Sequence, residues 1–323
     1  MMASALNPVR TWRVFMVTML VASVVLTACG GPKVKPDPAL IADAKRLASR
    51  GSTLYERGCY AEAERYFYQA METSRLMDDR PAIAKARNNL GAAALARGDL
   101  KQAAEHLSKA LDLNASLNNP ALDSLILGNL AGLAFKSGQR EDAEDLWRRA
   151  LETALTDEAR TGVALHQSNL GMLCRIAGRY TEAEAFLRDA QAEALTSGQT
   201  GILAGVHSEM GLLFMATGDL DQAEQHLITA LDLDKETENP RGIAEDLENL
   251  GQLYQASGQW EKAALELDQA IRLHAALAQP EKMKALLKLL QNNQAKSGKP
   301  DDIDTYRSLL EETQKDGRSV LCP

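Results

Sequence analysis

Apolar residues recur along most of the chain at the spacing of one helical face, and these faces come in consecutive pairs. In one representative stretch the first face lies within a helix predicted over 82–97 and is formed by Ile83, Ala86, Leu90 and Ala94. The second face lies within a helix predicted over 100–117 and is formed by Leu100, Ala103, Leu107, Ala110 and Leu111. Few Val or Ile residues stand in runs after residue 30, so no strand is predicted. The hydrophobic pattern therefore predicts an all-α body.

The paired faces repeat every 40 residues without insertion. Glycine marks the period at Gly58, Gly98, Gly138, Gly178, Gly218, Gly258 and Gly298. Alanine follows each of the first six glycines by five residues and again by twelve, as Ala103 and Ala110 follow Gly98. Such units cannot bury their apolar faces alone and stack on one another. We predict a superhelical solenoid of antiparallel helix pairs, with six units over 41–280.

Helix boundaries within a unit follow from a few residue types. Gly98 is expected to end the first helix, because glycine enters the left-handed conformation at little cost. Asp99 is expected to cap the second helix. Prolines are expected to break the chain between units at Pro81, Pro120, Pro240 and Pro280.

Glycine also stands in the middle of predicted first helices, at Gly91, Gly171, Gly211 and Gly251. Such a glycine costs about 1 kcal/mol relative to alanine. The cost is reasonable if the facing helix has to approach closely. The facing helix carries a large residue at the matching position, namely Phe67, Leu107, Trp147, Leu187, Leu227 or Leu267.

This spacing resembles the tetratricopeptide-repeat (TPR) pattern. It is seen in the stretches "NLGAAALARGDLKQAAEHLSKAL", "NLGMLCRIAGRYTEAEAFLRDAQ" and "NLGQLYQASGQWEKAALELDQAI". The usual unit has about 34 residues, whereas this period is 40. The longer units resemble those of kinesin light chain and of bacterial peptide-sensing regulators. Ala131 and Met210 depart from the Leu-Gly pair without changing the period.

The end of the chain departs further from the pattern. Gln291 stands where glycine is expected, and Ile303 and Arg307 replace the small and the large apolar residue. A solenoid needs a more polar final unit to cover its exposed end. We therefore predict a degenerate capping helix pair over 281–316, followed by a tail over 317–323.

The first 28 residues have the order of a signal peptide. Arg10 and Arg13 precede an apolar run that ends in Leu-Thr-Ala before Cys29. This order resembles a bacterial lipoprotein signal. The resemblance implies cleavage before Cys29 and a covalent lipid on Cys29, with no other cofactor. The alternatives are a plain secretory signal and an uncleaved anchor, although the run is shorter than the ~20 residues of a membrane span. The segment 29–40 carries three prolines and reads as a stiff tether.

The predicted location follows from the same resemblance. Gly30 rather than Asp after the lipidated cysteine favours the periplasmic face of the outer membrane over retention at the inner one. In an organism with one membrane, the site would be the outer face of the plasma membrane. The chain has a formal net charge of −8, so neither nucleic acid nor a second, electrostatic membrane contact is expected.

No catalytic or metal-binding motif is present in the sequence. The repeat explains the glycines, and His166 and His207 have no neighbouring residues at ligand spacing. We therefore predict a non-enzyme with no metal and no cofactor beyond the lipid. Cys174 is expected to be a buried small apolar residue.

Cys59 and Cys322 lie at opposite ends of the predicted stack. An intramolecular disulfide between them is therefore not expected. A bond between two copies stays open if the compartment is oxidising.

A row of polar residues defines the candidate binding surface. Two residues before each mid-helix glycine position stand Asn89, Asn129, Asn169, Glu209 and Asn249. One residue earlier stand Asn88, Ser168 and Ser208. First helices line the concave side of such a solenoid, and an amide can donate to and accept from the backbone of an extended peptide. The alternative is a set of inter-helix hydrogen bonds that fixes the superhelix.

These features predict a lipid-anchored extracytoplasmic scaffold or adaptor. Its expected partners are proteins or extended peptide segments, in the assembly of envelope complexes such as pilus, secretion or cell-wall machinery. The alternative is a self-assembling structural lipoprotein without a separate peptide ligand. The sequence leaves the oligomeric state open.

Overall fold

The computed structural model describes residues 37–156, 160–297, 303–316 and 319–322. The helical body is one compact unit, Leu40–Pro323. The predicted signal peptide and Cys29 lie outside the described residues. None of the described helices is both long and apolar enough to span a membrane.

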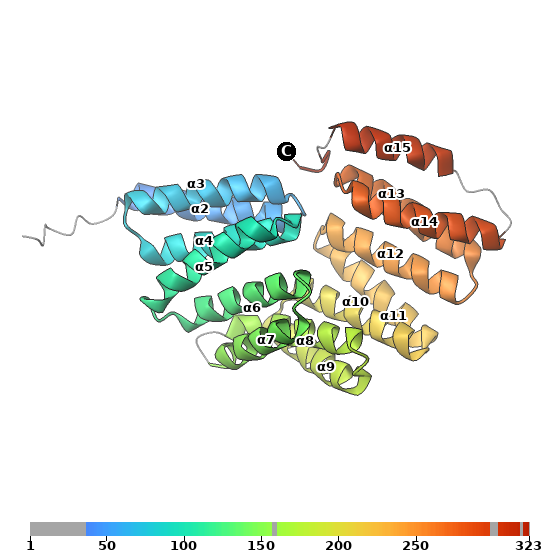
Figure 1. The fold of residues 1–323 in the computed structure, drawn as a ribbon, viewed down its shortest axis with the longest axis horizontal. Helices are drawn as coiled ribbons and strands as arrows, with labels where there is room; N and C mark the ends of the chain where they lie inside the picture. Colours follow the sequence, from blue (N-terminus) through green and yellow to red (C-terminus); the bar gives the residue numbers. More distant parts are fainter. Residues whose placement is uncertain (1–36, 157–159, 298–302, 317–318, 323) are drawn as a thin grey trace, which may run out of the picture. The chain divides into compact units, whose positions relative to one another are not determined.

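The described residues contain α-helices and one 3₁₀ turn, η1, and no strand (Figure 1). The fold class predicted from the hydrophobic pattern is thus confirmed. In chain order the helices are α2 (Pro38–Glu56), α3 (Tyr60–Leu76), α4 (Arg80–Arg97), α5 (Leu100–Ala115), α6 (Pro120–Lys136), α7 (Arg140–Ala154), η1 (Arg160–Gly162), α8 (Val163–Ile176), α9 (Tyr180–Ser197), α10 (Thr200–Thr217), α11 (Leu220–Glu236), α12 (Pro240–Ala256), α13 (Trp260–Ala276), α14 (Pro280–Ser297) and α15 (Ile303–Asp316).

Consecutive helices form antiparallel pairs, from α2–α3 to α14–α15, and each pair stacks on the next. First helices also contact one another along the stack: α4 packs on α6, α8 on α10, and α10 on α12. The first helices therefore lie on the inner, shorter side of the curve. The outer side is formed by second helices such as α5, α9 and α11.

The turns inside pairs follow the expected chemistry. Gly98 adopts φ +82° and ends α4, and the Asp99 side chain accepts a hydrogen bond from the Gln102 backbone N–H. The prolines act differently from the expectation, because they lie inside the next helix rather than before it. Pro120 is the first residue of α6, where a missing N–H costs no intrahelical hydrogen bond.

The predicted close approach is confirmed in the four pairs that carry the predicted mid-helix glycine. A Cβ added at Gly91 would lie 2.6 Å from Cγ of Leu107, and one added at Gly211 would lie 2.6 Å from Leu227. Gly171 and Gly251 meet Leu187 and Leu267 in the same way. Each of these leucines is fully buried. In these four pairs a leucine therefore fills the space that a glycine leaves on the facing helix.

The last two helices continue the stack. Met283, Leu286 and Leu290 of α14 are buried against the apolar cluster that contains Leu267 and Ile271 of α13. Tyr306 of α15 belongs to the same cluster. The capping role of 281–316 stays a prediction.

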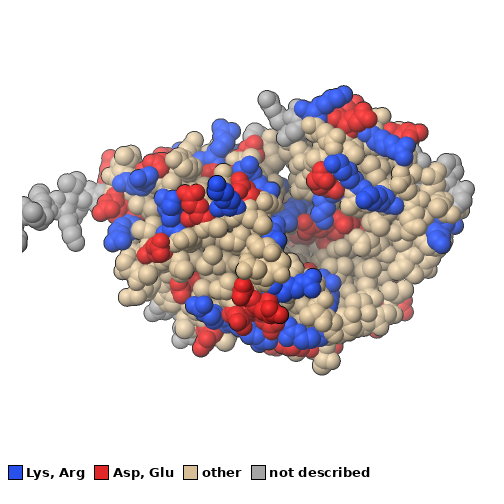
Figure 2. Space-filling model, in the orientation of Figure 1, with Lys and Arg blue, Asp and Glu red and all other residues tan. Residues whose placement is uncertain are grey.

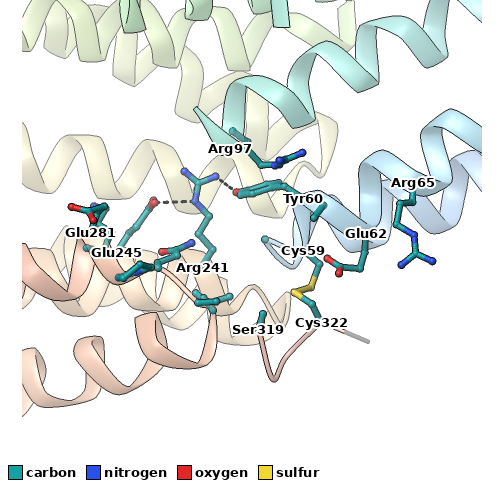
Figure 3. Close-up of a pocket in the computed structure, with 18 of the residues that line it drawn as sticks. Cys59, Tyr60, Glu62, Arg65, Arg97, Arg241, Glu245, Glu281, Ser319 and Cys322 are labelled. Carbon is teal, nitrogen blue, oxygen red and sulfur yellow. Dashed lines mark hydrogen bonds and ion pairs between the residues drawn. A yellow bond between two sulfur atoms is a disulfide. The ribbon is translucent and has the colours of Figure 1, made fainter. Parts of the chain in front are cut away.

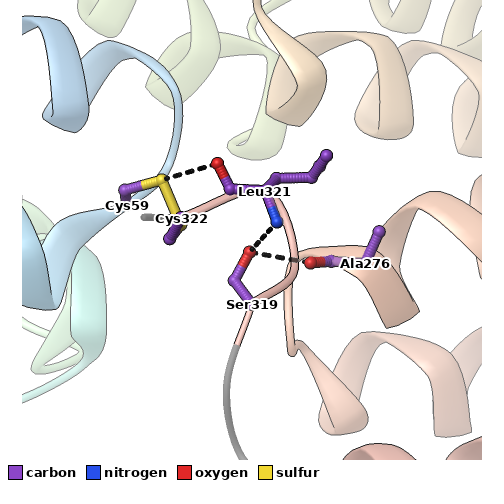
Figure 4. Close-up of a disulfide and its surroundings, with 5 residues drawn as sticks. All are labelled: Cys59, Ala276, Ser319, Leu321 and Cys322. Carbon is purple, nitrogen blue, oxygen red and sulfur yellow. Dashed lines mark hydrogen bonds between the residues drawn. A yellow bond between two sulfur atoms is a disulfide. The ribbon is translucent and has the colours of Figure 1, made fainter.

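The chain ends contradict one expectation from the sequence. Cys59, at the N-cap of α3, and Cys322, in the tail, form a disulfide with a Cα–Cα distance of 5.4 Å (Figure 4). The prediction of no intramolecular bond was wrong because it treated the stack as open. The stack curves far enough to bring residues 319–322 back to the turn between α2 and α3. Cys174 is a buried free cysteine, as expected.

Candidate functional site

The predicted row of polar residues lies on the inner helices α4, α6, α8, α10 and α12. Its five members are each partly buried, neither inside the core nor freely exposed. Their shared environment follows from the 40-residue period, which places them at one helical position in successive pairs. The neighbouring Asn88 is buried, and Ser168 and Ser208 are partly buried.

Two asparagines of the row bridge successive inner helices. Nδ2 of Asn129 donates to Oδ1 of Asn88 over 2.9 Å. Nδ2 of Asn249 donates to Oγ of Ser208 over 3.2 Å. Each bond joins residues 41 apart, so each one fixes the register between neighbouring pairs. This is the structural role that the sequence left open, although each amide keeps a second N–H and its carbonyl for other partners.

The other members differ among themselves. The carboxylate of Glu209 accepts from Nε of Arg175 over 2.9 Å. Burial raises the pKa of Glu209, and Arg175 opposes the shift. For Asn89, Asn169 and Ser168 the described residues provide no side-chain hydrogen bond. The row is thus structural at some positions and unengaged at others.

A cavity of about 900 Å³ opens where the two ends of the stack meet (Figure 3). Residues from both ends line it, as do Arg97 and Lys136 at the ends of the inner helices α4 and α6. In the space-filling view it is a hollow in which basic and acidic side chains are interspersed (Figure 2). The cavity therefore continues the concave surface to the junction of the ends.

Arg241 of α12 organises one wall of this cavity. Its Nη1 donates to the hydroxyl of Tyr60, and its guanidinium lies 5.4 Å from the centre of the Tyr60 ring. Its Nε donates to Glu245 over 2.9 Å. Burial raises the pKa of Tyr60 to about 12, so this hydroxyl stays protonated at neutral pH. Burial and the charge of Arg241 lower the pKa of Lys136, whose Nζ donates to the backbone oxygen of Leu95 over 3.0 Å.

Most of this wall was not predictable from the sequence. Nothing in the sequence brings Tyr60 near Arg241, 181 residues away. Neither residue stands at a conspicuous repeat position. The presence of two cysteines near opposite ends was the one available indication.

The site offers binding chemistry. Among the described residues, no group of three or more His, Cys, Asp or Glu side chains could hold a metal ion. The concave surface instead presents amides, hydroxyls and separated charges. These groups suit hydrogen bonding to a polypeptide.

The family is established by comparison with known sequences. The profile described as tetratricopeptide repeat matches residues 42–116, 123–192 and 203–276. These segments make up more than half of the chain. The protein therefore belongs to the TPR family, as the repeated small and large residues predicted.

Solved structures agree on the fold. The chain is 23% identical to BtubC (BKLC) from P. vanneervenii, with a TM-score of 0.50, covering 75% of this chain and 93% of that one. It is 13% identical to the apo form of RapI, with a TM-score of 0.56, covering 80% and 90%. It is 15% identical to a Rap protein complexed with Competence and Sporulation Factor, with a TM-score of 0.61, covering 74% and 65%. No curated protein matches the sequence. At these identities the likeness shows the fold alone.

Proposed function

We propose that this protein is a lipid-anchored scaffold of the bacterial cell envelope, and that its concave surface binds an extended segment of a partner protein. One observation carries the binding role. A row of amide and carboxylate side chains follows the inner helices at one repeated position, and part of it has hydrogen-bonding capacity left over. The proposed role is binding and not catalysis.

The chemistry of the row supports an extended ligand. Peptide N–H and C=O groups recur along an extended strand, and amides can satisfy both kinds. A related fold is also known with a bound factor, in the Rap protein complexed with Competence and Sporulation Factor. We extend that mode of binding to this chain as part of the proposal.

The membrane anchor and the location in the cell are the second part of the proposal. The order of basic, apolar and Leu-Thr-Ala-Cys residues supports lipidation of Cys29, and Gly30 supports the outer membrane. Anchoring by two or three acyl chains would be stable, since each buried methylene contributes about 0.8 kcal/mol. Mass spectrometry of the native protein and of Cys29→Ser tests this, and native protein without an acyl chain would refute it.

Asn169 and Asn129 separate binding from structure. Asn169 has no hydrogen bond within the described residues, whereas Asn129 holds Asn88. Asn169→Ala should weaken ligand binding without lowering the free energy of unfolding. Asn129→Ala should weaken ligand binding and also lower the free energy of unfolding. A lost hydrogen bond of this kind costs about 0.5–1.5 kcal/mol, so the double variant should bind roughly tenfold more weakly.

The probe is a ten-residue peptide selected from a random display library on the mature protein, with the oxidised and the reduced forms screened in parallel. Its Kd is measured by calorimetry for the native protein and the three variants, together with urea unfolding. Thr217→Ala, at the end of α10, is the matched control, because its hydroxyl bonds only within its own helix. If Asn169→Ala binds the peptide as tightly as the native protein does, the row is not the ligand site. A molecular mass that rises with protein concentration, together with no peptide binding, would favour the alternative of a self-assembling structural protein.

A further inference from the structure

The junction between the two ends of the stack is built differently from the other junctions of the fold. The tail, residues 319–322, lies at this junction. Oγ of Ser319 donates to the Ala276 backbone oxygen over 2.7 Å, and the Val320 N–H donates to the same oxygen over 3.0 Å. These bonds fasten the tail to the end of α13, and Cys322 then joins it covalently to Cys59 (Figure 4). The disulfide is thus the link between the last helix pairs and the first.

The remaining contacts across the junction are few and mostly polar. Arg57 and Glu238 form an ion pair over 3.5 Å between exposed side chains, and such pairs contribute little in water. Arg241 binds Tyr60, and the turn at Gly58 lies near Leu277. No leucine fills the space that a glycine leaves here, unlike in the four helix pairs with a mid-helix glycine. The non-covalent part of the junction is therefore weak compared with the stack itself.

The junction also bounds the concave surface. The cavity beneath it is lined by Tyr60 and Cys59 from the first pair and by Arg241 and Glu245 from the sixth (Figure 3). With the ends joined, the Cys59–Cys322 bond spans the gap between them on one side of this surface. With the ends apart, the same surface becomes an open groove.

We propose that the Cys59–Cys322 disulfide is a redox-controlled closure that governs access to the concave surface. The proposal rests on the binding role proposed above. In the oxidised protein the ends are joined and the groove is closed to entry from the side. In the reduced protein the ends separate and an extended segment can enter.

The chemistry is a thiol–disulfide exchange with a dithiol reductant. One thiolate of the dithiol attacks Sγ of Cys322, the S–S bond breaks, and Cys59 leaves as the thiolate. The second thiol of the reductant then displaces Cys322 and forms the reductant's own disulfide. The protein gains two electrons and two protons, and the dithiol loses them.

The two sulfurs differ in access, which sets the direction of attack. Cys59 is 1% exposed, whereas Cys322 in the tail is half-buried. Cys174 does not compete, because it is fully buried and burial raises its thiol pKa to about 11. Exchange is therefore expected at Cys322 alone.

The first test measures opening without any ligand. The mature protein with its disulfide intact is compared with the reduced protein and with Cys59→Ser/Cys322→Ser. Small-angle scattering should show a larger radius of gyration in both of the latter. Hydroxyl-radical modification of Tyr60 and Leu277, which are nearly buried at the junction, should rise several-fold. The Cys174→Ala variant is the matched control. Its two ends should stay joined until the Cys59–Cys322 disulfide is reduced.

Circular dichroism checks that the open forms keep their helices. An unchanged radius together with unchanged modification of Tyr60 in the folded double variant would overturn the closure. In that case the two ends of the stack would stay in contact without the disulfide, and the bond would only add stability.

The second test uses the display-selected peptide. Its Kd should be at least about tenfold weaker for the oxidised protein than for the reduced protein, because the joined ends disfavour the conformation that admits the peptide. Equal affinity in both redox states would overturn control of access and leave the binding role standing. A display selection that yields no binding peptide on either redox form would instead remove the binding role itself, and the redox control with it.

Discussion

At the scale of single residues, the fold depends on where a side chain is absent. The inner helix α10 illustrates this with two glycines. Gly211 faces Leu227, which is fully buried, whereas Gly205 is exposed and has no heavy atom within 4 Å of an added Cβ. The same substitution at these two positions isolates packing from helix propensity.

We expect Gly211→Ala to destabilise the protein and Gly205→Ala to stabilise it slightly. The new methyl at 211 would lie 2.6 Å from Cγ and Cδ2 of Leu227, and such overpacking costs roughly 1–3 kcal/mol. The gain in helix propensity, about 1 kcal/mol, is the whole effect at 205. Urea unfolding at one pH measures both variants. Equal free energies of unfolding for the two would contradict the interlocking of glycine and leucine.

At the scale of elements, two acidic side chains are buried in successive helices, Asp234 in α11 and Asp246 in α12. Asp234 and Asp246 are 5% and 1% exposed, and Nδ2 of Asn239 donates to Oδ1 of Asp234 over 2.9 Å. The position of Asp246 carries Ile126, Val206 and Leu286 in other pairs, so a carboxyl replaces an apolar side chain here. Burial, together with the charge of Asp234, raises the pKa of Asp246 to about 8. The carboxyl is therefore held in its protonated form near neutral pH.

This pair predicts a pH dependence of stability with a definite sign. Between pH 4 and pH 8 the folded protein holds a proton that the unfolded chain releases, so the contribution of Asp246 to stability is lost as pH rises. Asp246→Asn stays neutral and lacks this slope. The variant should match the native protein near pH 4 and exceed its free energy of unfolding at pH 8 by at least about 1.4 kcal/mol, the equivalent of one pKa unit.

Urea unfolding of both proteins from pH 4 to pH 9 checks this difference. The histidines contribute the opposite slope: burial lowers the pKa of His166 and of His207 to about 4, and the charge of His226 adds to the effect at His207. Because they are present in both proteins, their slope cancels in the comparison. Asp232→Asn, at an exposed position of α11, is the control and should change stability by no more than about 0.5 kcal/mol. A difference that does not grow with pH would contradict the buried proton.

At the scale of the whole molecule, the helix pairs were predictable from the sequence, whereas the contact between the two ends of the stack was not expected. The pairing of Gly91 with Leu107 was predictable, because every period repeats the same small and large residues. The bond between Asn88 and Asn129 lay within the alternatives, since both stand at repeated positions. The contact of Cys59 with Cys322 was not predictable. It depends on a small rotation at each junction summed over the whole stack, and no single residue encodes that sum.

Closure should also change how the stack unfolds. A solenoid is stabilised by contacts between neighbouring pairs, so an open one frays from its ends, where a pair has only one neighbour. With Cys59 joined to Cys322, neither end is free. Breaking a disulfide that closes a loop this long should lower the free energy of unfolding by roughly 2–4 kcal/mol. The loss should fall unevenly along the chain, because only the terminal pairs become free.

Hydrogen exchange on the oxidised protein and on Cys59→Ser/Cys322→Ser measures this directly. We expect faster exchange in α2, α3, α14 and α15 of the variant, and in the Val320 amide, whose bond to Ala276 would open more often once the tail is no longer tied to Cys59. The central pair α8–α9 should change least, because its neighbours on both sides are intact. Uniform acceleration across all helices would mean that the stack unfolds as a single cooperative unit. Unchanged exchange at both ends would mean that the terminal pairs are stable without closure, even if the ring opens on reduction.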